Sequence, residues 1–319
     1  MDVFISILLL IIGMALLIKG ADFFVDGASN IAKALRIPTL IIGLTLVSIG
    51  TSAPEFAVSL DASLKGENEI SFGNVVGSNI FNTFVVIGVS AIITPLAVSK
   101  NVKKFDIPIL LGIYGLLIIF GFVSSPNIIN LWEAIVIFSL TIIYTVFLII
   151  REKKEPQPEE KEEEKKKSWW LSLIFVAIGL AAIIFGGELV VDNAVLMAEK
   201  LHITKEIIGL TIIAIGTSLP ELVTSIVAAR KGENDIAVGN AIGSNIFNII
   251  LILGFCSILA PAAVTDSSLL DVIIVLFSGI VVFVFCFKSY KINRWQGVVM
   301  VSLYALYVTF LVLREIHII

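Results

Sequence analysis

Long apolar runs, each of roughly 20 residues, follow one another along the chain and are separated by short polar stretches. An α-helix of about 20 residues crosses a hydrocarbon core of about 30 Å. The runs have helical lengths rather than the short alternating pattern of barrel strands, which predicts an all-α polytopic membrane protein. Ten transmembrane helices are predicted, at residues 3–27, 39–64, 70–98, 105–123, 129–150, 169–194, 206–230, 236–261, 269–287 and 295–314.

The overall composition agrees with a chain whose main solvent is lipid. Hydrophobic residues make up 58% of the 319 residues, charged residues only 15%, and the mean hydropathy is +1.03. A soluble protein of this size needs more charge to cover its surface. The one long hydrophilic stretch, residues 151–168, is predicted to be a charged linker between two membrane domains, residues 1–150 and 169–319.

The two halves of the chain are copies of one unit. Residues 41–92 align with residues 207–258 without a gap, with 28 identities over 52 positions at a constant offset of 166. Each half is predicted to hold five spans. Because an odd number of spans makes the second copy enter the membrane from the opposite side, we interpret the chain as two inverted five-helix repeats.

The positions of lysine and arginine predict how the chain is oriented. With the N-terminus outside, the cytoplasmic segments hold 17 of these residues and the external segments hold 4. The positive-inside rule therefore predicts a multi-pass protein of the cell membrane with both termini external and the 151–168 linker in the cytoplasm. Inverted repeats are typical of secondary transporters, which bind their substrates near the middle of the membrane.

Two carboxylates are the strongest candidates for function. Glu55 lies near the middle of the second predicted span and Glu221 near the middle of the seventh. A carboxylate at that depth costs several kcal/mol unless it is paired, hydrated, protonated or bound to a cation. No lysine or arginine lies mid-span to neutralise either acid. The sequence therefore predicts a cation site.

Oxygen-bearing side chains accompany both acids. Residues spaced i, i+4, i+7 and i+11 share one face of a helix. Calcium takes about six to eight oxygen ligands, and sodium uses similar oxygens with less charge. The predicted polar faces are Ser48, Ser52, Glu55 and Ser59 in the second span; Ala214, Ser218, Glu221 and Ser225 in the seventh; Asn74, Ser78 and Asn82 in the third; and Asn240, Ser244 and Asn248 in the eighth.

Prolines interrupt the helices beside the two acids. Pro54 and Pro220 each precede a glutamate by one residue. Proline cannot donate a helical hydrogen bond, and its ring crowds the carbonyl four residues earlier. Helix breaks are therefore predicted at both positions, where irregular backbone can line an ion site at membrane depth.

These motifs resemble the α-repeats of prokaryotic sodium/calcium exchangers, members of the calcium/cation antiporter superfamily. The resemblance covers essentially the whole chain and is closest to compact ten-helix members. It is carried by Gly50-Thr51-Ser52-Ala53-Pro54-Glu55 with Gly77-Ser78-Asn79-Ile80-Phe81-Asn82, and by Gly216-Thr217-Ser218-Leu219-Pro220-Glu221 with Gly243-Ser244-Asn245-Ile246-Phe247-Asn248.

The resemblance implies an electrogenic antiporter that exchanges three sodium ions for one calcium ion, with the first and sixth spans sliding across the core. It implies a calcium site formed by Glu55, Glu221, Thr51 and Thr217. It implies sodium sites formed by Ser48, Ser52, Ser78, Glu55, Ala214, Ser218, Ser244 and Glu221, with Ser48 and Ala214 contributing backbone oxygens. Asn82 and Asn248 would line the site as amides. Potassium-dependent relatives carry an acid at the second of these positions, so the amide argues against potassium transport.

Alternatives remain at this point. The proton/calcium branch of the same superfamily typically has an Asn-Ala pair where this chain has Thr-Ser, so proton coupling is the second candidate. An intramembrane hydrolase with paired acids, or a cation channel, is a lower-ranked possibility. We expect a transporter rather than an enzyme, with calcium and sodium ions as transported species and membrane lipid around it. No cofactor, nucleic acid or obligatory protein partner is expected.

Overall fold

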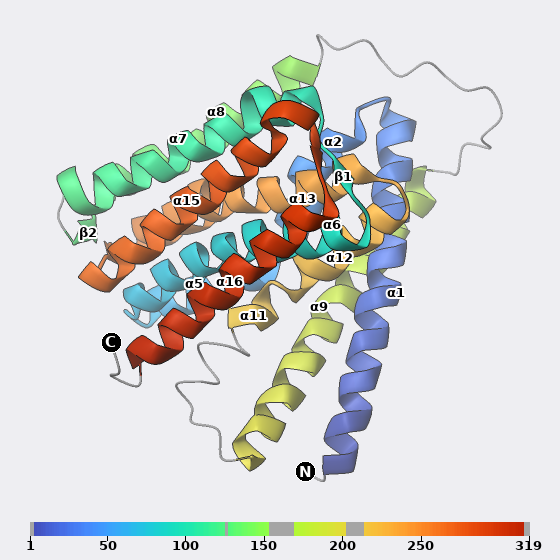
Figure 1. Ribbon diagram of the computed structural model, residues 1–319, viewed down its shortest axis with the longest axis horizontal. Coiled ribbons are helices and arrows are strands. Elements are labelled where there is room, and N and C mark those ends of the chain that lie inside the picture. The colour runs from blue at the N-terminus through green and yellow to red at the C-terminus, as the bar shows by residue number, and fades with distance from the viewer. Residues whose placement is uncertain (1–2, 125–126, 153–168, 202–213, 316–319) are drawn as a thin grey trace.

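The computed structural model describes residues 3–124, 127–152, 169–201 and 214–315, which are almost entirely helical (Figure 1). Within these ranges, 8 helices are long and apolar enough to cross a membrane, and a bent helix pair raises the number to 9. The chain is thus a multi-pass helical membrane protein, which confirms the predicted class.

The first half begins with one long helix and continues through helices interrupted by π-helical segments. In chain order the elements are α1 (Val3–Leu35), α2 (Thr39–Ile42), η1 (Gly43–Val47), α3 (Ser48–Thr51), α4 (Ala53–Leu64), α5 (Asn68–Phe81), η2 (Asn82–Val86), α6 (Ile87–Ile93), β1 (Leu96–Ala97), η3 (Val102–Asp106), α7 (Ile107–Ile118), η4 (Ile119–Ser124), β2 (Ile128–Ile129) and α8 (Leu131–Glu152).

The second half has a similar succession of elements, with one continuous helix, α15, where the first half has η3, α7 and η4. Its elements are α9 (Trp169–Lys200), α11 (Ala214–Thr217), α12 (Leu219–Arg230), α13 (Asn234–Phe247), η6 (Asn248–Leu253), α14 (Gly254–Leu259), β3 (Ala262–Ala263), α15 (Asp266–Ser289), β4 (Lys291–Ile292) and α16 (Arg294–Glu315). The predicted span 206–230 and the predicted linker 151–168 each lie partly outside the described residues.

Several predicted span ends differ from the helix ends. α1 continues to Leu35 and α9 to Lys200, whereas hydropathy placed the ends at 27 and 194. Hydropathy detects the segment inside hydrocarbon, and a helix continues beyond it wherever its backbone bonds and side-chain partners persist. The third span ends earlier than predicted, at Ile93, because Pro95 disfavours helical backbone in the residue before it.

α1 and α9 lie side by side along most of their length and project from the rest of the bundle (Figure 1). Glycines make this close contact. A methyl group added at Gly13 would lie 2.8 Å from the Gly186 carbonyl oxygen, and one at Gly20 would lie 2.8 Å from the Gly179 carbonyl oxygen. Small residues let membrane helices approach closely and gain van der Waals contact. α1 and α9 therefore form one tightly packed pair, here called the long-helix pair.

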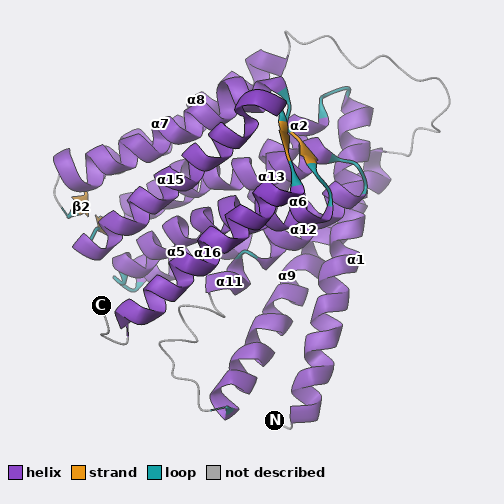
Figure 2. Cartoon of the chain, viewed as in Figure 1, coloured by secondary structure: helices purple, strands orange, loops and turns teal. Residues whose placement is uncertain are grey.

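Two short antiparallel ribbons connect the halves (Figure 2). In the first, β1 pairs with β4, with Leu96 opposite Ile292. In the second, β2 pairs with β3, with Ile129 opposite Ala262. Each ribbon takes one strand from the first half and one from the second, so the loops of the two halves are joined by backbone hydrogen bonds.

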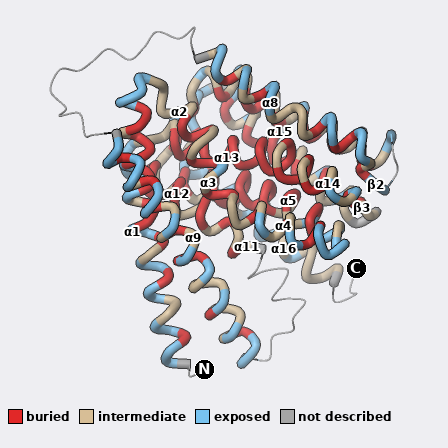
Figure 3. Tube along the Cα trace, turned by 180° about the vertical axis from the view of Figure 1, so that it is seen from behind, coloured by how far each residue is buried: buried red, intermediate tan, exposed pale blue. Residues whose placement is uncertain are grey.

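The buried core lies where the middle helices of both halves meet. Figure 3 shows burial concentrated on α5, α12 and α13, while the outer helices such as α1 and α8 carry many exposed positions. Exposed positions on those outer helices are mostly large and apolar, as in Ile142 and Phe4. An apolar exterior suits lipid, and the polar groups are collected inside.

Candidate functional site

The second span is broken at Ser52. The helix from Thr39 to Thr51 and the helix from Ala53 to Leu64 meet at an angle of 47°. Ser52 has φ −81° and ψ 10°, outside the α-helical region. Pro54 lies in the first turn of α4, where its missing N–H removes no helical bond within that helix.

The same break occurs in the second half. α11 ends at Thr217, Ser218 has φ −95° and ψ 9°, and Pro220 lies in the first turn of α12. Both glutamates therefore sit in the first turn of the helix that follows a break. The N–H groups of a helix start stabilise a negative charge there.

Hydrogen bonds cross between the two breaks. The Ser52 hydroxyl donates to Glu221 Oε1 at 2.8 Å, and the Ser218 hydroxyl donates to Glu55 Oε1 at 2.8 Å. All four side chains are buried, with at most 2% of their surface exposed. Because each serine precedes one glutamate but binds the other, the two bonds bring both carboxylates to one place in the core.

Two asparagines fix the backbone behind the glutamates. Asn74 Nδ2 donates to the Glu55 carbonyl at 3.1 Å and to the Ser59 hydroxyl at 2.9 Å. Asn240 Nδ2 donates to the Glu221 carbonyl at 3.2 Å and to the Ser225 hydroxyl at 2.9 Å. Ser59 and Ser225 thus act within the support of the site rather than beside the carboxylates.

The two asparagines differ in one respect. Asn240 also accepts a hydrogen bond from the Thr51 hydroxyl at 2.9 Å and is fully buried, whereas Asn74 is partly exposed. We expect Asn240→Ala to lower the free energy of unfolding by about 1–3 kcal/mol for each hydrogen bond lost, and Asn74→Ala to lower it less, because Asn240 makes one more bond and is fully buried. Thermal unfolding in detergent measures this difference. Equal Tm values for the two variants would contradict the expected difference.

The serines of the third and eighth spans occupy unequal surroundings. Ser244 Oγ lies 3.3 Å from the Ser48 carbonyl oxygen and 3.5 Å from Glu221 Oε1. The Ser48 hydroxyl itself donates to the Leu44 carbonyl at 2.7 Å, and the Ser48 carbonyl accepts the Ser52 backbone N–H at 3.0 Å. The Ser78 hydroxyl is buried and has no hydrogen-bond partner among the described residues.

Three further predicted residues, Thr51, Thr217 and Ala214, lie on the segments that precede the two breaks. The Thr51 hydroxyl also contacts the Val47 carbonyl at 3.1 Å, so its hydrogen is directed along its own helix or toward Asn240. Thr217 ends α11, beside the break at Ser218, and Ala214 is the first described residue of that helix. Each of these residues lies on the segment just before a break.

A second group of amides lies next to the site. Asn248 Nδ2 donates to Asn79 Oδ1 at 3.1 Å, Asn79 Nδ2 donates to the Asn245 carbonyl at 2.9 Å, and Asn245 Nδ2 donates to the Thr83 hydroxyl at 2.7 Å. Both polar atoms of the Asn82 amide are buried without a partner among the described residues.

The sequence patterns indicated no separate role for Asn79, Asn245 or Thr83. Their hydrogen bonds hold the third span against the eighth. Asn79 and Asn245 occupy equivalent positions of the repeated Gly-Ser-Asn-Ile-Phe-Asn motif, a signal that was available. Thr83 gave none, since its equivalent position holds Ile249.

The buried oxygens of the site fit a cation. Glu55 Oε2, Glu221 Oε2, Asn82 Oδ1, Asn248 Oδ1 and the Ser78 hydroxyl have no hydrogen-bond partner within the described residues. Buried polar atoms without a partner are costly and rare. No cluster of three or more His, Cys, Asp or Glu occurs in the described part of the chain. A cation held between the two carboxylates would therefore take its other ligands from neutral oxygens, a donor set that suits sodium and calcium.

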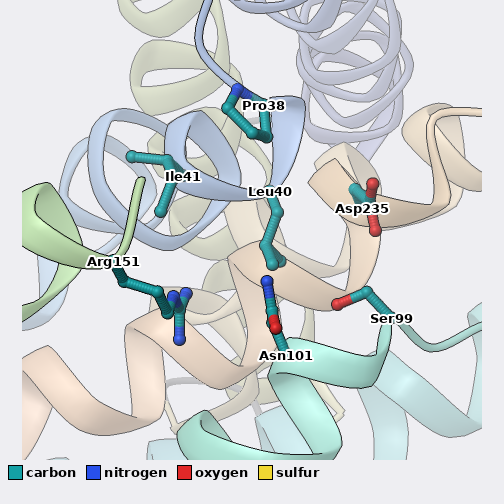
Figure 4. A pocket seen from close by; sticks show the side chains of 7 residues that line it. All are labelled: Pro38, Leu40, Ile41, Ser99, Asn101, Arg151 and Asp235. Atoms are coloured by element: carbon teal, nitrogen blue, oxygen red, sulfur yellow. The ribbon is translucent and has the colours of Figure 1, made fainter. Parts of the chain in front are cut away.

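One pocket lies apart from this cluster, and a second pocket meets it at Ser52. A pocket of about 90 Å³ is lined by residues from four segments of the chain, with Arg151 and Asp235 on different walls (Figure 4). Arg151 is already paired with buried Asp106 at 2.9 Å. None of the predicted ion-site residues lines this pocket.

The second pocket, of about 440 Å³, touches Ser52 but is otherwise apolar, with Phe56, Phe138 and Phe255 in its lining. Such a surface offers an ion no ligands beyond Ser52. The oxygen cluster around the breaks therefore lies outside the first pocket and meets the second only at Ser52.

The sequence model of the family described as "Sodium/calcium exchanger protein" matches residues 5–150 and 171–313. The sodium/calcium exchanger MaX1 of Methanosarcina acetivorans is 35% identical over 96% of this chain and 98% of its own length. The inner membrane protein YrbG of Escherichia coli is 38% identical over 80% of both chains. The solved structure of a sodium/calcium exchanger from Methanococcus jannaschii superimposes with a TM-score of 0.84 at 32% identity, over 97% of this chain and 99% of that one.

Proposed function

The chain belongs to the sodium/calcium exchanger protein family, whose members are transporters rather than enzymes, and from that premise we propose that it exchanges sodium for calcium across the cell membrane. The observation that carries the proposal is the pair of crossed hydrogen bonds, Ser52 to Glu221 and Ser218 to Glu55. They gather two acids and several neutral oxygens into one buried cluster.

Charge favours calcium as one of the two ions. Glu55 and Glu221 together carry −2 when ionised, and a divalent cation neutralises them. Asn82 and Asn248 are amides, and within the described residues no third acid joins the two glutamates in a cluster that would need another cation. Sodium ions compete for the same oxygens, and the exchange of three sodium ions for one calcium ion moves one net charge per cycle.

Switching access requires a moving element. The long-helix pair is the best candidate, because α1 and α9 are packed closely on each other while both run past the broken helices. Sliding of this pair across the core exposes the site to one face and then the other. Each set of bound ions must stabilise a state able to switch, whereas two bare carboxylates resist occlusion.

The proposed architecture is ten spans in two inverted five-helix repeats, residues 1–150 and 169–319, joined by the charged 151–168 linker. Reciprocal contacts support it, since the serine–glutamate bonds and the two ribbons each pair one half with the other in exchanged roles. The excess of lysine and arginine on one set of loops orients both termini outside and the linker inside.

Calcium uptake into proteoliposomes tests the coupling ion. With sodium inside, we expect rapid uptake of radioactive calcium that an inside-positive potential enhances, because more positive charge leaves than enters. Vesicles loaded with potassium should show little uptake. Uptake driven by a proton gradient and indifferent to sodium would overturn sodium coupling and move the chain to proton/calcium exchange.

A further inference from the structure

The two halves carry matching charges where the long-helix pair meets the core. At the offset of 166, Lys65 corresponds to Lys231, Asp22 to Glu188, and Asp26 to Asp192. Lys231 follows α12 and Lys65 follows α4, so each lysine lies in the turn after a broken helix. The acids lie on α1 and α9. Equivalent positions thus hold one lysine on the core and two acids on the long-helix pair in each half.

At the turn between α12 and α13, in the second half, the lysine contacts both acids of α1. Lys231 Nζ lies 2.8 Å from Asp26 Oδ1 and 3.4 Å from Asp22 Oδ1, and it donates to the Asp22 carbonyl at 2.9 Å. The Ser29 hydroxyl donates to Glu233 Oε1 at 2.6 Å, two residues further along the turn. Four contacts therefore fasten α1 to the turn between α12 and α13.

The equivalent turn of the first half, between α4 and α5, has a different ion pair. Lys65 pairs instead with Asp61 of its own helix at 2.6 Å, and hydrogen bonding to this carboxylate raises the pKa of the lysine. Glu188 and Asp192 are exposed, and no ion pair joins either of them to Lys65 among the residues the structure describes. Val195 stands at the position equivalent to Ser29 and cannot make the additional hydrogen bond.

The two turns lie near opposite ends of the first broken span, which the proposed topology places on opposite faces of the membrane. The Lys231 turn contacts α1 near Ser29, close to the end of α1 at Leu35. α2 starts directly after that end, and the broken span then crosses the membrane before it reaches Lys65. One face is therefore fastened to the long-helix pair while the other is not.

We propose that Lys231 and Lys65 are alternating latches, each holding the long-helix pair to the core in one of the two access states. The proposal rests on the alternating access inferred above. Because glycine contacts lock α1 to α9, the pair moves as one body, and a displacement that separates Asp22 and Asp26 from Lys231 also shifts Glu188 and Asp192. In the other access state the two halves exchange roles. Glu188 and Asp192 then pair with Lys65, which no longer pairs with Asp61.

The latches are unequal in strength. The Lys231 turn makes one contact, from Ser29 to Glu233, that the Lys65 turn cannot make, because Val195 stands at the position of the serine. The state shown here, with the Lys231 latch engaged, is therefore the favoured one. Removing the Lys231 latch shifts the balance between the two access states in one direction, and removing the Lys65 latch shifts it in the other.

Pulsed electron paramagnetic resonance tests the proposal on the full chain. Spin labels on introduced cysteines at Phe185 of α9 and Ile142 of α8, both exposed, report how far the long-helix pair lies from the core. We expect Lys231→Gln to raise the minor distance population about fivefold relative to the major one, the size of one exposed ion-pair network. Lys65→Gln should lower that population by a similar factor.

Matched variants separate a latch from a fold defect. Lys231→Arg keeps the positive charge and should retain the parent distribution. Lys100→Gln removes an exposed lysine elsewhere and should leave the distribution unchanged. If Lys231→Gln and Lys65→Gln shift the populations in the same direction, or neither shifts them, the latches are disproved.

Failure of the latches is distinguishable from failure of the proposed function. The distance populations are measured without transport, whereas the coupling ion is read from calcium uptake by the unmodified protein. If the unmodified protein exchanges sodium for calcium and both lysine variants keep the parent distribution, only the latch proposal is overturned. Transport without sodium dependence would overturn the exchange proposal while the opposite shifts of the two variants still upheld the latches.

Discussion

Glu55→Gln and Glu221→Gln should each abolish calcium transport while the protein still folds and inserts. Each carboxylate is fully buried and has one oxygen without a hydrogen-bond partner among the described residues. Loss of one unit charge about 4 Å from a calcium ion removes about 8 kcal/mol of attraction at an effective dielectric constant near 20, so affinity falls by at least about 1,000-fold. Sodium-dependent calcium uptake and calcium binding measured by calorimetry both test this.

Glutamine is the informative replacement because its amide oxygen can still accept the hydrogen bond from Ser218 or Ser52. The packing of the two breaks is thereby kept while the charge is removed. Glu69→Gln, at an exposed position at the start of α5, is the matched control and should transport normally. Substantial exchange by either buried variant would remove these carboxylates from the calcium site.

Gly179→Ala should destabilise the long-helix pair and slow exchange. A methyl group at this position would lie 2.6 Å from the Phe24 backbone nitrogen and 2.7 Å from the Gly20 carbonyl oxygen. Backbone atoms cannot rotate away, so α1 and α9 must separate. Overpacking of this kind costs about 1–3 kcal/mol. Thermal unfolding in detergent should show a lower Tm, and the initial uptake rate should fall with it.

Gly112→Ala is the control for this change. Gly112 lies within α7, and a methyl group there meets no atom within 4 Å in the described part of the chain. Alanine is favoured over glycine inside a helix by about 0.5–1 kcal/mol, so this variant should be unchanged or slightly more stable. Equal Tm values for the two variants would mean that α1 and α9 accommodate the added volume and are not locked together.

The sequence was sufficient to predict the helical membrane class, and the repeat identified the two acids. Glu55 and Glu221 stood out because each lies mid-span without a basic neighbour. What helical spacing could not predict is that Ser52 binds Glu221 rather than Glu55. Periodicity relates residues on one helix, whereas this bond depends on how the two breaks face each other.

Sequence patterns did not predict the two ribbons or the ends of α1 and α9. The ribbons are only two residues long on each strand, too short to give an alternating signal. The ends of α1 and α9 were missed because polar residues such as Asp26 reduce hydropathy without ending the helix. Asp26 instead contacts Lys231, which lies more than 200 residues away in the sequence.

The crossed serine–glutamate bonds also bear on how such a chain can arise. Neither half contains a complete set of contacts, since Ser52 needs a glutamate from the other copy and β1 needs a strand from it. Two identical half-length chains placed antiparallel in a bilayer would supply each other with all of them. A half-length ancestor of this kind must insert in both orientations, which a weak charge bias permits. Fusion through a hydrophilic linker then allows each copy to keep one orientation and acquire its own loop charges.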